Sequence, residues 1–186
     1  MAGRDDSGYA AFVVASGPAL RRTAYLMCGD WDRAADIVQE TLIRLYVAWP
    51  RLDQDRDVRA YARRTAVRIA IDHSRRLSSR EAPTLDLVDA AVADFSGQVA
   101  DRAVLMAALA DLPARQRACV VLRFYDDLSV GSVAEALGCR TGTVKSQTAR
   151  GLAALRAAYA RHGGELHPAQ RGPTPEGAAE EERAVP

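Results

Sequence analysis

Residues that favour β-strands are scarce in this sequence. Aromatic residues make up 6% of the 186 residues, and runs that alternate apolar and polar side chains are almost absent. Alanine, leucine and arginine are abundant instead, and these residues favour helices. The sequence therefore predicts an all-α fold.

Apolar runs long enough to cross a membrane are also lacking. No run approaches the ~20 residues that a spanning helix needs. The first residues are polar and acidic, unlike the basic and then apolar pattern of a secretory signal. We therefore expect a cytoplasmic protein with no membrane insertion.

Cysteine is rare and follows no pattern typical of a bound metal or a disulfide framework. Cys28, Cys119 and Cys139 lie far apart, and no CxxC pair occurs. We interpret all three as buried thiols. The three histidines form no metal set, and neither a catalytic triad nor a phosphate-binding glycine loop is recognisable. We expect no enzyme activity, no metal and no cofactor.

Lysine is nearly absent, and the charge is unevenly distributed. Lys145 is the only lysine, and the other 24 basic residues are arginines, which a GC-rich genome can explain. The net charge of +1 alone predicts no polyanionic partner. Residues 51–80, however, hold nine arginines and four aspartates, and residues 163–186 hold five glutamates and two arginines. A basic block in the middle is thus followed by an acidic tail.

Helical periodicity and turn residues divide the chain into two helical units. We expect a break at Pro18 inside the first helix and an N-cap from Asp30 or Asp32 on the second. The helices are expected at about 7–28, 31–49, 56–77, 99–111, 114–125, 129–137 and 141–161. The expected organisation is a domain over 1–78, a flexible linker over 79–98, a domain over 99–162 and a disordered acidic tail over 163–186.

Residues 129–150 have the spacing of a helix-turn-helix motif. Ala134 is small where two helices would cross, Gly138 can take the positive φ of a tight turn, and Val144 would anchor the second helix on the first. A plain helical hairpin is the alternative. The wheel of the second helix predicts one buried face made of Val144, Thr148, Leu152, Leu155 and Tyr159.

The opposite face of that second helix carries no acidic residue. No Asp or Glu occurs from 136 to 161, whereas an ordinary solvated face, which is the alternative, usually mixes both signs of charge. Short hydroxyl side chains, an amide and cations suit the major groove of DNA. The candidate DNA-binding residues on this face are Thr143, Lys145, Ser146, Gln147 and Arg150.

The helix expected at 32–49 has an unusual outer face. Its core side carries Ala34, Ile37, Val38, Thr41, Leu42, Leu45 and Trp49. Opposite them, aliphatic residues lie among acids and an amide within about 100° of arc, which suggests a protein-binding patch. The alternative is that the two aliphatic residues meet a neighbouring helix. The patch consists of Asp36, Gln39, Glu40, Ile43 and Val47.

The helix expected at 57–76 is dense in arginine. It has one apolar band of Val58, Ala62, Ala66 and Ile69, and a second band of Val67 and Ile71. Like charges at this density destabilise a helix unless a polyanion binds them, and a merely solvated basic face is the alternative. The arginines are Arg59, Arg63, Arg64, Arg68 and Arg75, of which Arg64, Arg68 and Arg75 form a stripe.

Three runs carry a family resemblance. They are DIVQETLIRLYVAW followed by the arginine-rich helix, then LADLPARQRACVVLRFYDDLS, then VAEALGCRTGTVKSQTARGLAALR. In this order, over residues 7–160, they resemble bacterial sigma factors of the extracytoplasmic function (ECF) group of the sigma-70 family. The runs GTVKSQ and RTAYLMCGDW look most like the actinobacterial SigE-family branch.

The resemblance implies two small helical domains, region 2 and region 4, that bind core RNA polymerase and direct promoter-specific transcription initiation. Region 2 would dock on the β′ clamp helices through the patch around Asp36, and region 4 would hold the β flap. An anti-sigma factor is left open as a further partner. This chain departs from the family at Ser132, where a glutamate is frequent, and this puts only the details of −35 contact in doubt.

The resemblance also assigns the two DNA-binding segments. Residues 51–76 would capture and melt the −10 element, and residues 140–150 would recognise the −35 element. The −10 candidates are Arg59, Arg63, Arg64, Arg68, Arg75 and Arg76, and the −35 candidates are Arg140, Thr141, Thr143, Lys145, Ser146, Gln147 and Arg150.

Two other functions remain open on the residues alone. An ordinary helix-turn-helix transcription regulator would need a dimer interface or a ligand-sensing domain, and the arginine stripe would then lack a reason. An interaction protein, such as an anti-sigma partner, would have no DNA role. Co-purification with core polymerase separates the sigma-factor hypothesis from both.

Overall fold

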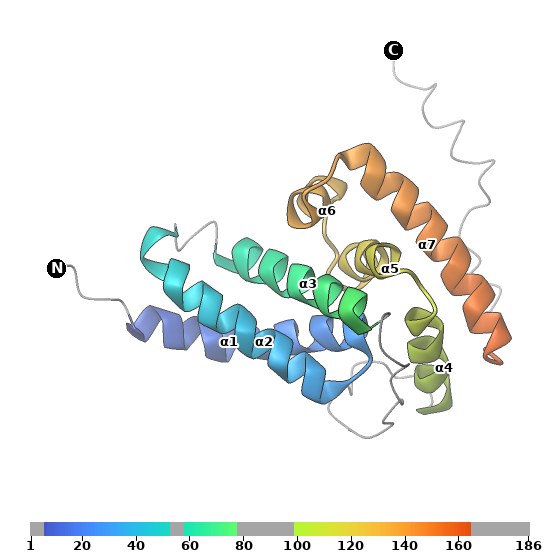
Figure 1. Ribbon diagram of the computed structural model, residues 1–186, viewed down its shortest axis with the longest axis horizontal. Helices are drawn as coiled ribbons and strands as arrows, with labels where there is room; N and C mark the ends of the chain where they lie inside the picture. The colour runs from blue at the N-terminus through green and yellow to red at the C-terminus, as the bar shows by residue number, and fades with distance from the viewer. Residues whose placement is uncertain (1–5, 53–57, 78–98, 165–186) are drawn as a thin grey trace, which may run out of the picture.

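The computed structural model describes residues 6–52, 58–77 and 99–164, and every regular element in these ranges is a helix (Figure 1). The all-α prediction is therefore confirmed for this part of the chain. None of these helices is long and apolar enough to cross a membrane. In chain order the elements are α1 (Asp6–Cys28), α2 (Trp31–Ala48), η1 (Trp49–Arg51), α3 (Val58–Leu77), α4 (Val99–Ala110), α5 (Ala114–Val120), η2 (Val121–Tyr125), α6 (Val130–Leu137) and α7 (Thr141–Arg161).

Helices α1, α2 and α3 form an N-terminal unit with a shared apolar core. Asp30 caps α2, because its carboxylate accepts a hydrogen bond from the backbone N of Arg33 at 2.7 Å. The expected core side of α2 is buried except for Leu42, which is half-buried. The expected break at Pro18 is wrong, because α1 continues through it. A proline costs one hydrogen bond to the preceding turn, and packing of α1 on α2 and α3 holds the helix on both sides.

Helices α4 to α7 form a C-terminal unit, and α6 and α7 are a helix-turn-helix. Gly138 ends α6 with a φ of 62°, in the left-handed region expected for the turn. Val144 is fully buried and Ala134 is buried, as the motif requires. The helix expected over 114–125 is α-helical only to Val120 and then widens into the π-helical turn η2.

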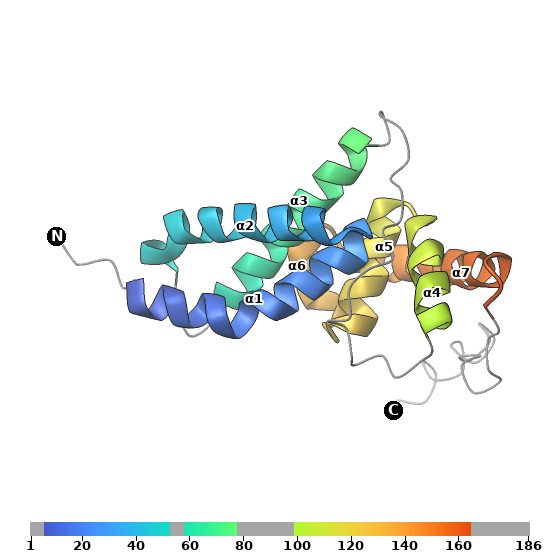
Figure 2. The same ribbon diagram turned by 90° about the horizontal axis from the view of Figure 1, so that it is seen from below.

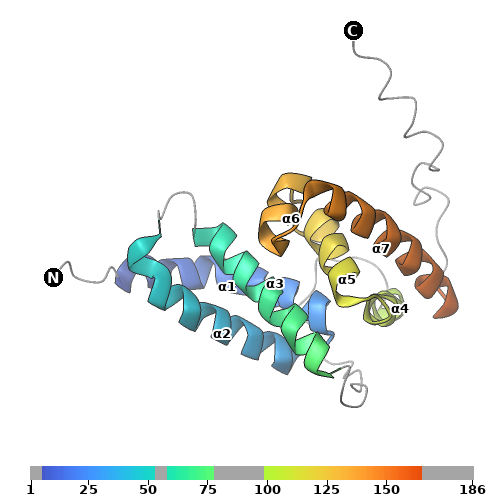
Figure 3. The ribbon, with the colours of Figure 1, turned by 45° about the horizontal axis from the view of Figure 1, so that its top comes forward.

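The two units pack against each other. Helix α3 contacts α5 and α6, and α1 contacts α4, α5 and η2; Figures 1 and 3 show α6 and α5 beside α3, with α7 on the outside. Figure 2 shows α4 beyond the end of α1 and next to α7. One continuous cluster of buried side chains runs through both units. The linker expected over 79–98 and the tail from 165 onward lie outside the described residues.

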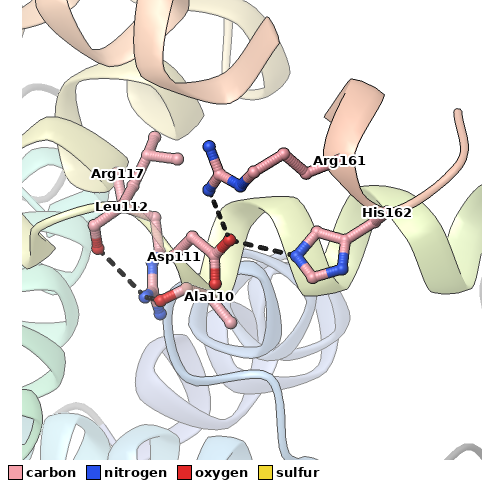
Figure 4. Close-up of polar contacts among 6 residues, drawn as sticks. All are labelled: Ala110, Asp111, Leu112, Arg117, Arg161 and His162. Carbon is pink, nitrogen blue, oxygen red and sulfur yellow. Dashed lines mark hydrogen bonds and ion pairs between the residues drawn. The ribbon is translucent and has the colours of Figure 1, made fainter. Parts of the chain in front are cut away.

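Arg117, the second arginine of the LPxRxR run, joins the two units by hydrogen bonds. Its Nη2 donates to the carbonyl oxygens of Ala110 and Leu112 at 2.6 and 3.2 Å (Figure 4). Its Nη1 donates to the carbonyl oxygen of Met27 in α1 at 2.6 Å. Burial lowers the pKa of Arg117. These carbonyls would otherwise lack partners at helix ends, so Arg117 closes two helix C-termini at once.

The C-terminal end of α7 is fixed to α4 through Asp111. This carboxylate accepts from Arg161 Nη2 at 2.9 Å and lies 3.0 Å from His162 Nε2 (Figure 4). The two partners hold the pKa of Asp111 below its usual value, with His162 the larger cause. All three side chains are solvent-accessible, so these contacts orient the helix end more than they stabilise it.

The buried line of α7 differs from the predicted one. Val144 is buried as expected, but Thr148, Leu152, Leu155 and Tyr159 are only half-buried. The fully buried positions after Val144 are Gly151 and Ala158. The wheel ranked positions by apolar size, whereas α5 approaches α7 where the side chains are smallest. A Cβ on Gly151 would lie 2.8 Å from Val120 Cγ2 and 3.1 Å from the carbonyl oxygen of Gln116.

The close approach of α5 to α7 at Gly151 leads to a prediction about stability. Gly151→Ala should lower the free energy of unfolding by about 1–3 kcal/mol, as overpacking does, although alanine ordinarily favours a helix interior by up to about 1 kcal/mol over glycine. Gly142→Ala in the same helix is the control, because nothing lies within 4 Å of the added Cβ, and it should be neutral or stabilising. Urea unfolding measures both, and a higher midpoint for Gly151→Ala would contradict the packing.

Candidate nucleic-acid and polymerase interfaces

Helix α7 presents the predicted polar face to solvent. Its N-terminal turn follows directly from the turn at Gly138, so the first residues of α7 project from the helix-turn-helix. Ser146 Oγ donates to the carbonyl oxygen of Thr143 at 3.0 Å, so that one hydroxyl is held close to the helix. Thr143 and Gln147 are half-buried, and the exposed members are Arg140, Thr141, Lys145, Ser146 and Arg150.

Helix α6 is capped in a way that accounts for Ser132. Ser129 Oγ accepts from the backbone N of Ser132 at 3.0 Å, and the two hydroxyls lie 2.9 Å apart. A glutamate at Ser132 would complete a capping box, whereas the Ser132 hydroxyl contacts the hydroxyl of the capping Ser129. Ser132 therefore has a structural role in starting α6.

The six arginines predicted to contact the −10 element do not form a single free surface. Arg59, Arg68, Arg75 and Arg76 are exposed on α3, and Arg64 is half-buried. Arg63 instead faces the C-terminal unit, where its Nε lies 3.3 Å from Asp126 Oδ2. Within the predicted stripe, Arg68 also reaches the C-terminal unit, where its Nη2 lies 3.2 Å from the position that a Cβ on Gly138 would occupy. Arg63 belongs to the contact between the two units.

Asp126 is a site residue that the sequence analysis missed. It follows η2, its side chain is only 9% exposed, and it accepts a hydrogen bond from Thr23 Oγ1 of α1 at 2.9 Å. Burial raises the pKa of Asp126, and the Thr23 hydrogen bond and the Arg63 charge oppose that shift. In the sequence, Asp126 is one of two adjacent aspartates near a turn, and nothing there distinguishes it from its exposed neighbour Asp127.

The outer face of α2 keeps its aliphatic residues in solvent. Ile43 is 59% exposed and Val47 is 66% exposed, so within the described residues neither meets a neighbouring helix, the alternative that the wheel left open. Asp36 and Gln39 are exposed as well. Glu40 pairs with Arg44, and its Oε2 lies 3.7 Å from His73 Nε2 of α3. These contacts hold the carboxylate at the edge of the patch.

A mainly apolar groove of about 620 Å³ between α1 and α2 extends this patch. Gln39 and Ile43 form part of its wall, and Arg21, Arg22 and Trp31 line it as well. Arg21 lies over the Trp31 ring at 5.2 Å from its centroid. The patch is therefore the edge of a concave surface, and a partner that binds there can insert an apolar side chain.

The three cysteines are not arranged for redox or metal chemistry in the described residues. Cys119 is buried, Cys28 and Cys139 are half-buried, and all three are free thiols. Burial raises the pKa of Cys28 and that of Cys119 to about 11, which makes these thiols unreactive at neutral pH. Residues 6–52, 58–77 and 99–164 contain no cluster of three or more potential metal ligands.

Comparison with known proteins gives the family. The model of the Sigma-70 region 2 family matches residues 12–80, and that of Sigma-70, region 4 matches residues 102–155. The RNA polymerase sigma-E factor of Streptomyces avermitilis is 41% identical over 138 residues, which cover 74% of this chain and 77% of that protein. The ECF RNA polymerase sigma factor SigW of Bacillus subtilis is 31% identical over 168 residues, which cover 82% and 89%.

Solved structures share the fold. The sigma factor RpoE from Bartonella quintana, in complex with the anti-sigma factor NepR, aligns with a TM-score of 0.66 at 22% identity, over 81% of this chain and 95% of that one. CnrH in complex with the cytosolic domain of CnrY aligns with a TM-score of 0.57 at 22% identity, over 80% and 85%.

The chain belongs to the sigma-70 family, within its ECF group, with α1–α3 in region 2 and α4–α7 in region 4.

The exposed arc of α7 supports a prediction that separates base reading from phosphate binding. On the helix wheel drawn from the sequence, Arg150 lies near the centre of the arc and Lys145 at its edge. Both side chains are exposed in the structure, and the buried line through Gly151 and Ala158 turns the exposed arc toward Lys145. Arg150→Ala should cost about 1–3 kcal/mol on the best −35 sequence and relax preference at one or two positions. Lys145→Ala should weaken all sequences alike and lower the salt slope by about one.

A randomised −35 library, transcribed with core polymerase and each variant, tests this assignment. If Lys145→Ala changed sequence preference and Arg150→Ala did not, α7 would lie in the groove rotated from the orientation proposed here.

Proposed function

We propose that this chain is a sigma factor that binds core RNA polymerase and directs promoter-specific transcription initiation. The observation that carries the proposal is the presence, in one chain, of a helix-turn-helix whose second helix, α7, contains no acidic residue and a separate helical unit with an exposed aliphatic patch. Membership of the ECF group supports it. A regulator that acts alone needs the first feature and has no use for the second.

Each unit would have its own partner surface. The patch of α2, continued by the groove between α1 and α2, would dock on the β′ clamp helices, and α7 would read the −35 element. The exposed arginines of α3 would contact the −10 region, and region 4 would also hold the β flap. We place these functions in domains 1–78 and 99–162. An anti-sigma factor that covers either surface would silence the protein.

The chemistry of transcription would belong to the polymerase. The role proposed for this chain is recognition and positioning, without catalysis and without a cofactor, and it would be carried out in the cytoplasm with the polymerase. The basic surfaces of the two units are modest, so each unit alone would bind DNA weakly. Polymerase would fix the spacing of the two units and so raise their effective concentration on DNA.

Run-off transcription on genomic fragments with core enzyme tests the proposal. The full chain should give promoter-specific transcripts that core alone does not make, and the same chain without core should bind those promoters only weakly at physiological salt. Tight binding of promoter duplex by the free chain, with no transcript on addition of core, would favour the ordinary helix-turn-helix regulator.

Docking should depend on the outer face of α2. Asp36→Arg with Ile43→Glu changes only exposed side chains, so circular dichroism should not change. The pair should weaken binding to core polymerase by about 2 kcal/mol or more, as the loss of interface hot spots does. A pull-down with core, followed by titration, measures the effect.

Val14→Glu is the matched control. Val14 on α1 is 79% exposed, so the change introduces the same acid in place of an exposed aliphatic residue outside the patch, and core binding should be kept. Normal transcription by the Asp36→Arg, Ile43→Glu protein would show that the partner face is elsewhere.

A further inference from the structure

The groove between α1 and α2 carries positive charge without a matching acid. Arg21 and Arg22 are the only charged side chains among the described residues that line it. Arg21 is exposed and Arg22 is half-buried, and neither forms an ion pair within the part of the chain that the structure describes. The rest of the lining is mainly apolar. An occupant that fits this groove therefore carries both carboxylates and apolar groups.

The chain itself contains a segment with this chemistry. Residues 165–186 follow the last described residue, Gly164, and hold five glutamates and two arginines. Four of the glutamates fall in the run GPTPEGAAEEE over 172–182, which has no basic residue, and Ala184 and Val185 follow it. A single exposed pair of arginine and glutamate contributes little, but a tethered segment binds at an effective concentration of about the millimolar range. Weak contacts are then sufficient for binding.

Helix α4 links the start of this segment to the groove. Arg161 at the end of α7 contacts Asp111, which directly follows α4. Near the other end of α4, Arg102 lies over the Tyr25 ring, and Tyr25 stacks on Trp31 of the groove at 4.0 Å between ring centroids. Figure 2 shows α4 next to α7 and beyond the end of α1. The end of α7 and the Trp31 end of the groove thus lie at opposite ends of one short helix.

The acidic run is long enough to cover that path. From Arg102 to Asp111 the helix rises by about 14 Å, and each of the two helix–helix contacts adds about 10 Å. Glu176 lies twelve residues beyond Gly164, and an extended chain of that length spans up to about 40 Å. The glutamates from 176 onward are therefore within reach of Arg21 and Arg22.

We propose that residues 172–186 bind the groove between α1 and α2, with the glutamates over 180–182 at Arg21 and Arg22, and that they compete there with core polymerase. The competition rests on the proposed function, whereas binding of the segment to the groove does not need polymerase. The acidic tail is then an internal competitor that sets how tightly the chain docks.

The competition follows from shared residues. Gln39 and Ile43 belong both to the docking patch on α2 and to the wall of the groove, so an occupied groove covers part of the patch. Asp36 and Glu40 on the same patch repel an acidic segment. They direct the glutamates of the tail to the end of the groove that carries the two arginines.

Quenching of tryptophan fluorescence by acrylamide tests the contact in the free protein. Trp31 and Trp49 are the two tryptophans of the chain, and Trp49 is only 3% exposed whereas Trp31 is half-buried in the groove wall. With the groove occupied about two-thirds of the time, Trp31 should be quenched about twofold or more weakly in the full chain than in a chain stopped after Gly164. Trp31→Phe should abolish the difference. Acrylamide is neutral, so the charge of the tail does not repel it.

Charge variants of the tail identify the groups responsible. Glu180→Gln with Glu181→Gln and Glu182→Gln should make the full chain behave like the truncated one. Arg171→Gln with Arg183→Gln is the matched control, because it changes charge in the same segment and should keep the protection of Trp31. About 0.5 M salt should remove the protection in the unchanged chain, since exposed ion pairs are screened.

The arginines of the groove are tested by comparison within one background. Arg21→Gln with Arg22→Gln changes the surroundings of Trp31 directly, so the full and the truncated chain must both carry it. In that background, truncation should no longer change the quenching, as expected when each change removes the same interaction.

Binding to core polymerase tests the competition. At the same occupancy of about two-thirds, the truncated chain should bind core about threefold more tightly than the full chain. High salt should remove this ratio as well. Truncation after Gly164 removes none of the described helices, so circular dichroism should show the same helical signal per molecule for both chains.

The outcomes separate this inference from the proposed function. Equal quenching of Trp31 in the full and the truncated chain would overturn it, and protection that rises with protein concentration would replace the tail by a second copy of the chain. Protection of Trp31 with equal affinities for core would refute the competition. Protection of Trp31 in a protein that binds no core in either form would reject the proposed function and leave the contact between tail and groove in place.

Discussion

The burial of α3 on two sides is the constraint on which the rest of the structure depends. One side packs on α1 and α2 to complete region 2, and the other packs on α5 and α6 of region 4. The same helix carries all six arginines proposed for the −10 element. A helix with two apolar bands leaves only narrow strips for its charged side chains. Arg63 therefore falls within the contact, and Arg68 lies beside it, next to the turn at Gly138.

The polar contacts between the units follow from that packing. Apolar area provides the drive, at roughly 25 cal/mol per Å² removed from water, but it does not fix how region 4 is rotated on region 2. Arg117 and Asp126 fix this rotation, because each side chain finds its hydrogen-bond or ion-pair partners in region 2 in only one relative orientation of the two units. Such a contact can fix one orientation without adding much stability, because the free-energy cost of desolvating the charged groups offsets much of their electrostatic attraction.

The sequence was sufficient for most of the local structure. Capping by Asp30, the left-handed Gly138 and the buried Val144 each rest on a local rule, and the structure confirms them. The exposure of Ile43 and Val47 was also predictable, because the core side of α2 is already complete without them. The break predicted at Pro18 was wrong, because packing of α1 on both sides outweighs one lost hydrogen bond.

The contact between the units was beyond the reach of sequence patterns. Gly151 signals close approach only when α5 is known to lie over it, and Asp126 differs from Asp127 only in which one points toward α1. The two apolar bands of α3 did indicate two packing partners, and the second band is the signal from which the contact with region 4 could have been inferred. The roles of single arginines toward DNA stay predictions.

The most direct measurement of the account is the distance between the two units in the free chain. Spin labels on exposed Val14 of α1 and Ala149 of α7, attached through unnatural amino acids, report it by pulsed electron paramagnetic resonance. We predict one narrow, short distance distribution, because α3 packs on both units. A broad distribution or one with several maxima would contradict the account.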